Sequence, residues 1–391
     1  MIDQAKRYQD PGQHLLMGNV AMAEGAMAAG LQFFAGYPIT PSTEVLELLS
    51  HRLPETGGTF IQMEDEIASI NAMIGASLAG AKVMTATSGP GTALMAETIS
   101  MAACLEIPFV ICDVQRNGPG TGFVTAPHHN DIMQCKYSGN GEYEVIAFAP
   151  MSCQELFDLT IEAFNMAEKF RCPTFILSDA YLGHLHEQVR IPPAKELEAR
   201  VVERLPPDRE TKRFFTFRDD AGAIHIPPPP RVGQDPFPAY LFSQPHGADG
   251  IPVEKDRALE FIERICHKVT DNVDSIAMTD EYLVDDADII IIAYGLPARV
   301  SYDVVNKARS TGIAIGLIRL VTVWPFPYEK LKQLIAGKRV LILPEMNQGM
   351  IAGEIERVMD ELSRIERIPS IGDIHHPDSI MKVVKEVARK S

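Results

Sequence analysis

The chain has 391 residues, of which 46% are hydrophobic, enough for two α/β-sized domains or three smaller ones, each with its own core. Its formal net charge of −16 has the wrong sign for a chain that gains affinity by neutralising phosphates, which argues against nucleic acid as a partner. The uncharged helical run over residues 67–81 has 15 residues, fewer than the roughly 18 that a membrane span needs, and the N-terminus has no apolar signal core. We therefore expect a cytoplasmic protein with no membrane segment.

The first half of the chain has the pattern of a parallel sheet. From residue 14 to about residue 190, apolar runs alternate with helical patterns, as in a sheet covered by helices on both faces. The best delimited helix runs from Ser152 to about residue 170, because Ser152 and Glu155 form an S-x-x-E capping box. We assign residues 1–190 to a first domain. Its predicted strands are residues 31–37, 83–87, 109–114, 145–149 and 174–178.

Residues 191–283 interrupt this pattern. Twelve of the 28 prolines fall between residues 191 and 252, including the run 227–230, and proline neither continues a helix nor donates to a sheet ladder. The same stretch contains aromatic residues, which are scarce in disordered linkers. We expect an extended Pro-rich connector that packs along a surface, followed by a helical segment over residues 253–269.

A second α/β unit is expected over residues 284–391. Strands and helices alternate there in the order of a compact doubly wound domain of about 105 residues, a common size for this architecture. The predicted fold class is therefore α/β, with two doubly wound domains joined by the connector. The predicted strands are residues 289–294, 314–320 and 339–343, and the predicted helices are residues 298–310, 328–335 and 353–364.

The six cysteines are at least eight positions apart, so no C-x-x-C motif provides a metal cluster or a dithiol pair. Any iron–sulfur chemistry is therefore expected on another chain, and in a reducing compartment most of these thiols are expected to be small core residues. They are Cys104, Cys112, Cys135, Cys153, Cys172 and Cys266.

The first candidate site is the turn over residues 36–44, where the first predicted strand ends and a helix begins. Thr40 is suited to the N-cap of this helix and Pro41 to its first position, so the turn can be explained as a helix start alone. The turn also lies at the carboxyl edge of a parallel sheet, where open α/β folds bind ligands, and it offers a hydroxyl and backbone amides to an anion.

The second candidate is an acid at the start of the uncharged helix 67–81. Glu64, Asp65 and Glu66 precede this helix. The presence of Glu64 and Asp65 is explained well by solvent-exposed carboxylates that interact favourably with the helix dipole. Glu66 lies closest to the apolar stretch, where partial desolvation raises the pKa of a carboxyl and suits it to share a proton with a ligand nitrogen. Helical geometry alone does not choose among the three.

The third candidate is Arg116, which follows the apolar strand 109–114. An arginine at a strand's carboxyl end can clamp a carboxylate with two hydrogen bonds, and the alternative is a structural ion pair with an acid such as Asp113. The turn over residues 88–92 contains two glycines, which permit close approach of a ligand or a neighbouring subunit. Two histidine pairs, 128–129 and 375–376, lie near aspartates but lack H-x-x-x-H spacing, so we expect no metal site.

Taken together, these segments resemble the α subunit of the 2-oxoacid:ferredoxin oxidoreductases, the thiamine-diphosphate enzymes that include 2-oxoglutarate synthase and pyruvate synthase. The resemblance spans nearly the whole chain. Residues 37–42 resemble the family's signature turn, residues 63–66 its pyrimidine-domain glutamate region, residues 115–116 its substrate-arginine segment, and residues 319–327 the RLxTxxPFP stretch of transketolase C-terminal-like domains. The first domain is thus similar to the pyrimidine-type thiamine-diphosphate-binding fold, and the second to the transketolase C-terminal-like domain.

The resemblance implies a role for each candidate. Glu66 would be the catalytic acid that hydrogen-bonds the aminopyrimidine of thiamine diphosphate, while Thr40 and Arg116 would bind the substrate. The residues expected to contact the cofactor are Tyr37, Pro38, Ile39, Glu66, Ser88 and Gly89. The implied activity is 2-oxoacid oxidative decarboxylation with transfer of the acyl group to coenzyme A and of electrons to ferredoxin, or its reverse.

The resemblance also implies that the enzyme needs further chains. Thiamine-diphosphate enzymes hold the pyrophosphate through Mg²⁺ on a GDG motif, which this sequence lacks. A β subunit is therefore expected to carry the pyrophosphate-binding domain, the Mg²⁺ and a [4Fe-4S] cluster, with γ and δ subunits completing the complex. Because ferredoxins are typically acidic, a subunit with a charge of −16 is a poor docking face, and ferredoxin is expected to bind a partner chain.

The substrate is left open by the sequence. The order of expectation is 2-oxoglutarate, then branched-chain 2-oxoacids, then pyruvate. Residues 125–131 replace the polar Thr-Lys run of many 2-oxoglutarate members, although His128 or His129 could reach a distal carboxylate. Two alternatives of another class are a noncatalytic scaffold subunit and an acyl-transferring enzyme like transketolase, which needs no external electron acceptor.

Overall fold

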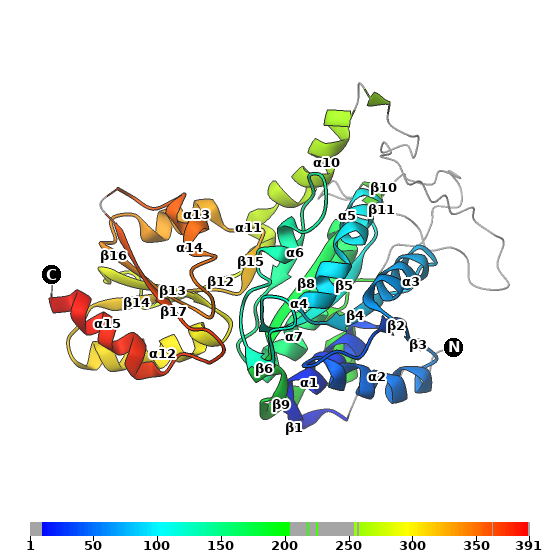
Figure 1. Ribbon diagram of the computed structural model, residues 1–391, viewed down its shortest axis with the longest axis horizontal. Helices are drawn as coiled ribbons and strands as arrows, with labels where there is room; N and C mark the ends of the chain where they lie inside the picture. The colour runs from blue at the N-terminus through cyan, green and yellow to red at the C-terminus, as the bar shows by residue number, and fades with distance from the viewer. Residues whose placement is uncertain are drawn as a thin grey trace.

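The computed structural model describes residues 10–203, 217–218, 224–225, 254–255, 258–361 and 363–389. These residues form two large sheets, each flanked by helices, and two two-stranded ribbons (Figure 1). Of the Pro-rich stretch 191–252 in the predicted connector, the structure describes residues 191–203 and two short strands, β10 (Phe217–Arg218) and β11 (Ile224–His225). Within the described parts of the chain, no helix has the length and apolar character that crossing a membrane requires.

The first sheet has eight strands in the order β15-β7-β8-β5-β4-β2-β3, with β6 paired to β5 beside this path. All of its strands run parallel except β15 and β6, which are antiparallel to their neighbours. The strands are β2 (Phe33–Gly36), β3 (Thr59–Gln62), β4 (Val83–Thr87), β5 (Phe109–Asn117), β6 (Phe123–Pro127), β7 (Ile146–Phe148), β8 (Pro173–Asp179) and β15 (Thr322–Trp324).

Helices cover both faces of this sheet because its central strands are apolar on both sides. On β5, Val110 and Cys112 enter the core under one set of helices, whereas Phe109 and Ile111 enter the core under the other, as the alternation of a strand requires. The first set is α1 (Gly18–Ala29), α2 (Thr43–Glu55) and α7 (Cys153–Phe170), and the second is α3 (Glu66–Leu78) and α5 (Ala96–Cys104). Shorter elements are α4 (Gly89–Leu94), α6 (Gln134–Tyr137), α8 (Ala180–His184), α9 (Ala194–Arg200) and the antiparallel ribbon of β1 (Gly12–Met17) and β9 (His186–Ile191).

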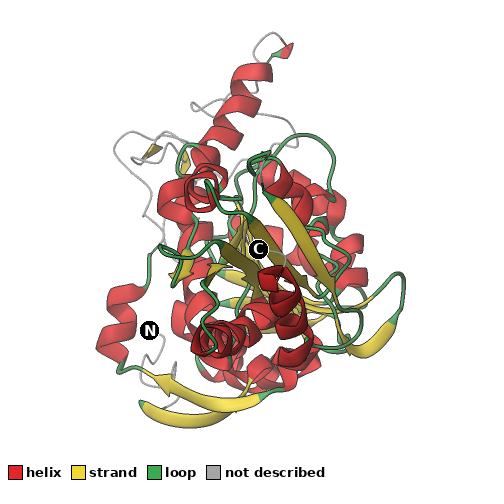
Figure 2. Cartoon of the chain, turned by 90° about the vertical axis from the view of Figure 1, so that its left-hand side faces the viewer, coloured by secondary structure: helices red, strands yellow, loops and turns green. Residues whose placement is uncertain are grey.

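The second sheet has five strands in the order β12-β14-β13-β16-β17, of which only β12 is antiparallel. Its strands are β12 (Thr279–Tyr282), β13 (Ile289–Tyr294), β14 (Ile315–Leu320), β16 (Val340–Glu345) and β17 (Arg364–Pro369). One face packs on α12 (Gly295–Ser310) and α15 (Pro377–Arg389), and the other on α13 (Tyr328–Ile335) and α14 (Ala352–Glu356). In the view from the side of this sheet, α15 brings the C-terminus to the front (Figure 2). Helices α10 (Ala258–Thr270) and α11 (Val273–Ile276) precede the sheet in the chain.

The two sheets are joined by non-local contacts. Strand β15 follows β14 in the chain but pairs with β7 of the first sheet, and the indole Nε1 of Trp324 donates to the carbonyl of Ile132 at 2.7 Å. One apolar core contains residues from both sheets, including Ile111 and Ile290. The division into residues 1–190, 191–283 and 284–391 stays a prediction, and β15 shows that the residues of the second part complete the sheet of the first.

Three local expectations were wrong. The helix predicted over residues 353–364 is only five residues long, Ala352–Glu356, and β17 begins at Arg364. The capping box is only half formed: Ser152 Oγ accepts from the amide of Glu155 at 3.2 Å, but the Glu155 carboxylate accepts from Met151 and not from Ser152. The predicted N-cap at Thr40 is replaced by Ser42, because a turn from Ile39 to Ser42 closes before α2 begins at Thr43.

Candidate functional site

The candidate residues gather at the carboxyl edge of the parallel strands of the first sheet. The turn after β2 carries Thr40, α3 begins with Glu66 shortly after β3, β4 leads into the turn at Ser88, and β5 ends in the segment with Arg116. Parallel strands bring all of their carboxyl ends to one edge, so four segments that are far apart in the sequence meet there.

Glu66 is the first residue of α3, and its side chain is buried. Asp65 is the N-cap, with its carboxylate accepting from the amide of Ala68 at 2.7 Å. Glu66 is 4% exposed, whereas Glu64 is exposed and Asp65 is partly exposed. Burial raises the pKa of Glu66 above its usual value, and hydrogen bonding and the charge of Arg116 only partly offset this effect. Of the three acids that the sequence left open, Glu66 is therefore the one in a desolvated position.

The segment that leads from β4 into the first residues of α4, residues 88–91, packs directly against Glu66, and we call it the glycine turn. Thr87 Oγ1 lies 3.5 Å from Glu66 Oε1. A Cβ added to Gly91 would lie 2.0 Å from Thr87 Oγ1 and 2.5 Å from Glu66 Oε1, so only glycine fits there. The Ser88 hydroxyl is buried without a hydrogen-bond partner in the described part of the chain. Thr87 was not among the predicted site residues. It could have been predicted, because it is the last residue of a predicted strand, and the carboxyl ends of parallel strands form the edge where ligands bind.

Arg116 is buried and contacts the turn that carries Thr40. Its Nη1 donates to the carbonyl of Thr40 at 2.8 Å, whereas its Nε is buried without a partner. Within the described residues no carboxylate lies within 4.0 Å of its guanidinium, so the alternative of an ion pair with Asp113 is wrong. Residues 113 and 116 are three apart on β5 and point to opposite faces of the strand.

The turn after β2 is held by backbone contacts and faces solvent. Ser42 Oγ donates to the carbonyl of Ile39 at 2.9 Å, and Asn19 Nδ2 donates to the carbonyl of Pro41 at 2.7 Å. Ile39 is partly exposed. Three further residues of the turn are exposed: Tyr37, Pro38 and Thr40. The structure thus brings Thr40 to Arg116 through its carbonyl, and its hydroxyl makes no hydrogen bond with the described residues.

The two adjacent histidines point to different partners. His128 Nδ1 contacts Asn130 Oδ1, whereas His129 Nε2 lies 3.1 Å from Asp179 Oδ2 and its ring packs on Tyr294 of the second sheet. His128 Nε2 is buried without a partner in the described part of the chain. Across the residues that the structure describes, no three His, Cys, Asp or Glu side chains come together as a metal site.

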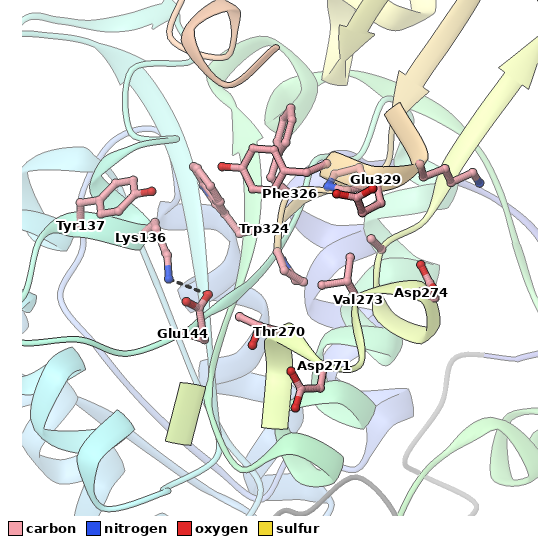
Figure 3. Close-up of a pocket in the computed structure, with 15 residues that line it drawn as sticks. Lys136, Tyr137, Glu144, Thr270, Asp271, Val273, Asp274, Trp324, Phe326 and Glu329 are labelled. Carbon is pink, nitrogen blue, oxygen red and sulfur yellow. Dashed lines mark ion pairs between the residues drawn. The ribbon is translucent and has the colours of Figure 1, made fainter. Parts of the chain in front are cut away.

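A cavity of about 520 Å³ lies where the sheets meet, between α6, α11 and the segment after β15 (Figure 3). Lys136 points toward Glu144 across this cavity, and the two form an ion pair at 2.6 Å. Aromatic side chains, among them Trp324 and Phe326, line another part of the wall. None of the predicted site residues lines it, so this cavity is separate from the group around Glu66.

The residues present fit the pyrimidine side of a thiamine-diphosphate site. Glu66 is a carboxyl whose pKa is raised by burial, and the absence of a side chain at Gly91 lets the backbone approach this carboxyl closely. The half-paired guanidinium of Arg116 lies within the same group of turns. The Glu66 carboxyl is suited to hydrogen-bond a nitrogen of an aromatic ring that lies against the glycine turn. The Arg116 guanidinium is suited to bind a carboxylate beside it.

Comparison with protein families gives a match in both halves of the chain. The family described as "Pyruvate flavodoxin/ferredoxin oxidoreductase, thiamine diP-bdg" matches residues 24–243, which is more than half of the chain. The family "Pyruvate:ferredoxin oxidoreductase core domain II" matches residues 287–379.

Individual relatives agree with these families. The chain is 40% identical over 375 residues to the 2-oxoglutarate synthase subunit KorA of Methanothermobacter marburgensis, covering 95% of this chain and 98% of the relative. It is 42% identical over 371 residues to KorA of Methanocaldococcus jannaschii, covering 94% and 98%. It is 36% identical over 380 residues to the ketoisovalerate oxidoreductase subunit VorB of Methanothermobacter marburgensis, covering 96% and 98%.

A solved structure matches almost the whole chain. The 2-oxoglutarate:ferredoxin oxidoreductase from Magnetococcus marinus, with 2-oxoglutarate, coenzyme A and succinyl-CoA bound, has a TM-score of 0.87 at 29% identity. The match covers 96% of this chain and 65% of that longer chain. The chain therefore belongs to the 2-oxoacid:ferredoxin oxidoreductase family, among the α subunits that are similar to KorA.

Proposed function

We propose that this chain is the α subunit of an enzyme that converts 2-oxoglutarate, coenzyme A and oxidised ferredoxin to succinyl-CoA, CO2 and reduced ferredoxin, or catalyses the reverse. The observation that carries the proposal is the buried carboxyl of Glu66 at the start of α3. The choice of 2-oxoglutarate is supported by the two relatives from Methanothermobacter marburgensis, of which KorA is 40% identical to this chain and VorB is 36% identical.

In this proposal Glu66 holds a proton for the aminopyrimidine ring of thiamine diphosphate. Its burial favours the neutral carboxyl, which can donate to a ring nitrogen and take the proton back. The cofactor, when bound, supplies the nucleophilic carbon and the electron sink for decarboxylation. The turn residues Tyr37, Pro38 and Ile39, together with Ser88 and Gly89, are assigned to the walls of the cofactor site.

Arg116 and the Thr40 hydroxyl are assigned to the substrate carboxylate. The Nη1 atom of Arg116 is engaged by the Thr40 carbonyl, but its Nε–Nη2 edge makes no hydrogen bond with the described residues. A buried Nε without a partner is costly, and a carboxylate can accept from Nε and Nη2 at once. His128 remains the candidate for the distal carboxylate, because His129 is held between Asp179 and Tyr294.

A second chain is assigned to complete the cofactor site. Large apolar side chains are exposed on the elements that border it, and exposed apolar groups in one region often mark an interface. They are Tyr37, Ile61, Ile67, Leu94 and Phe123, with exposed fractions of 39, 37, 46, 51 and 73%. We assign this border to the β subunit, which carries the pyrophosphate-binding domain, Mg²⁺ and a [4Fe-4S] cluster. The γ and δ subunits and ferredoxin are assigned to sites on partner chains.

The proposal is tested by isolating the chain with its co-purifying partners and assaying reduction of ferredoxin or a viologen dye. We expect coenzyme A-dependent reduction that is fastest with 2-oxoglutarate, slower with branched-chain 2-oxoacids and slowest with pyruvate. A preference for a branched-chain 2-oxoacid would keep the enzyme class and overturn the substrate. Turnover that persists without any electron acceptor would instead indicate an acyl-transferring enzyme like transketolase.

A further inference from the structure

Two buried aspartates lie behind the glycine turn and have no part in the function proposed above. Asp113 on β5 is 0% exposed, and Asp131, in the loop before α6, is 2% exposed. Thr92 Oγ1 donates to Asp113 Oδ2 at 3.0 Å, and Asn130 Nδ2 donates to Asp131 Oδ1 at 2.5 Å. The second carboxyl oxygen of each, Asp113 Oδ1 and Asp131 Oδ2, is buried without a partner in the described residues. A buried carboxylate oxygen without a hydrogen bond costs free energy, and this cost is smaller when the carboxyl group binds a proton and becomes neutral.

The carboxyl of Asp131 fills the space that a side chain at residue 89 would occupy. A Cβ added to Gly89 would lie 2.5 and 2.6 Å from the two carboxyl oxygens of Asp131. The backbone of Asp131 is itself fixed, since its amide donates to Gln115 Oε1 at 3.0 Å. Gln134 Nε2 donates to the carbonyl of Gly89 at 3.0 Å. The turn is thus packed between two groups of side chains: Asp131 contacts it at Gly89, and Glu66 and Thr87 contact it at Gly91.

The surroundings of the two aspartates favour a bound proton. No cation lies within 4.0 Å of either carboxyl in the described part of the chain, and the charged or titratable groups that face the pair are Arg116, His129, Cys112 and Cys135. Burial raises the pKa of Asp131 to about 6, with Asn130, His129 and Arg116 acting in the other direction. Burial and then the charge of Asp131 raise the pKa of Asp113 well above its usual range. Burial and the charge of Asp131 thus both oppose ionisation of Asp113.

We propose that Asp113 and Asp131 carry one proton as a pair and act as positioning residues that hold the Ser88–Gly91 turn in the form that binds the cofactor. The pair acts through the turn, because Asp131 contacts Gly89, and Thr92 within α4 hydrogen-bonds to Asp113. The cofactor role of the turn belongs to the proposed function, so this inference rests on it. Loss of the last proton would place two charges behind the turn and loosen it.

The direction of the pH dependence follows from the raised pKa values. The folded chain binds more protons at this pair than the unfolded chain does, so the free energy of unfolding falls as pH rises from the unfolded value of about 4 through the folded values. Asp131→Asn removes one of the two like charges and should flatten this decline above pH 6. Asp274→Asn, at an exposed aspartate on α11, is the matched control and should leave the decline as in the wild type.

The experiment measures two quantities on the complex with its co-purifying partners. The first is the unfolding temperature without cofactor between pH 5.5 and 9, for the wild type, Asp131→Asn and Asp274→Asn. The second is the dissociation constant of thiamine diphosphate by calorimetry at pH 7, for the wild type, Asp131→Ala and Asp131→Asn. We expect Asp131→Ala, which removes the support behind Gly89, to raise the dissociation constant about tenfold, equivalent to about 1.4 kcal/mol. Asp131→Asn should recover most of this loss.

The outcomes separate this inference from the proposed function. A flatter pH profile in Asp131→Asn and weakened binding in Asp131→Ala that is recovered by Asn support the positioning pair. If the wild-type complex binds thiamine diphosphate but Asp131→Asn has the wild-type pH profile, or Asp131→Ala binds as tightly as the wild type, the pair has no such role. If the wild-type complex binds no thiamine diphosphate, the proposed function fails and this inference fails with it.

Discussion

The guanidinium of Arg319, on β14, donates to both carboxylate oxygens of Glu155, on α7, at 2.8 and 2.5 Å. Arg319 is 3% exposed and the Glu155 side chain is 24% exposed, so this bidentate pair between α7 and β14 is mostly buried. The same carboxylate accepts from the amide of Met151 at 2.8 Å at the start of α7. The glutamate that sequence pattern assigns to local helix capping therefore also links the two sheets.

We expect Arg319→Met to reduce the free energy of unfolding by about 3 kcal/mol, because it keeps the packing of the side chain and leaves the Glu155 carboxylate without its partner. Urea unfolding measures this loss. Arg299→Met is the control, since Arg299 forms a more exposed pair with Glu187 and should cost less than about 1 kcal/mol. Equal effects of the two substitutions would contradict the assignment.

Glu66→Gln should lower kcat about 10²- to 10⁴-fold in the assembled complex, the range in which a positioned proton-transfer group contributes. Glutamine keeps the size of the side chain and its contact with Thr87 but can no longer release and recover a proton. Glu64→Gln is the control, because Glu64 is exposed two residues earlier. Viologen-linked turnover distinguishes the two, and near-normal turnover of Glu66→Gln would favour the alternative of a noncatalytic scaffold subunit.

The raised pKa of Glu66 gives a second test, on stability. Because burial raises this pKa, the folded chain keeps the proton to a higher pH than the unfolded chain, so the contribution of Glu66 to stability declines as pH rises through the folded pKa. Glu66→Gln removes this titration and should make the unfolding temperature fall less steeply above pH 5. An unchanged slope in differential scanning calorimetry would mean that the carboxyl titrates as in the unfolded chain.

The apolar pattern predicted the central strands well but not the edges. The strand at residues 83–87 agrees with β4 residue for residue, because all five residues are buried and none is charged. Strand β3 was missed because it is exposed and polar at the sheet edge. Strand β15 was missed for a different reason: its partner, β7, is far away in the sequence, and no local pattern encodes that pairing.

The candidate site was predictable where position on a strand or helix decides burial. Glu66 follows from its place next to an uncharged helix, and Arg116 from its place at the end of β5. The alternation of side chains along β5 could also have excluded the pair of Arg116 with Asp113. The roles of Asp113 and Asp131 could not be predicted, because the contact of Asp131 with Gly89 joins a loop to a distant turn.

Arg116→Ala should lower kcat/KM for the 2-oxoacid by an amount equivalent to about 2 to 5 kcal/mol, chiefly through KM, because a buried carboxylate loses its partner. Arg116→Lys keeps the charge but not the unpaired Nε–Nη2 edge, so it should recover only part of the loss. Steady-state kinetics with 2-oxoglutarate measures both variants. An unchanged kcat/KM in Arg116→Ala would reassign the residue to holding the Thr40 turn.

Gly91→Ala should weaken thiamine-diphosphate binding and destabilise the chain, because the added Cβ would lie 2.0 Å from Thr87 Oγ1 and 2.5 Å from Glu66 Oε1. A clash of this kind in a packed interior costs about 1 to 3 kcal/mol. Gly75→Ala is the matched control on α3: it has no neighbouring atom within 4 Å of the added Cβ and should stabilise the helix by about 0.5 to 1 kcal/mol. Urea unfolding and calorimetric binding to the complex measure both effects. Because the clash at Gly91 falls on the carboxyl itself, binding that survives in Gly91→Ala would show that Glu66 can move away without loss of the cofactor, and its proposed role would not hold.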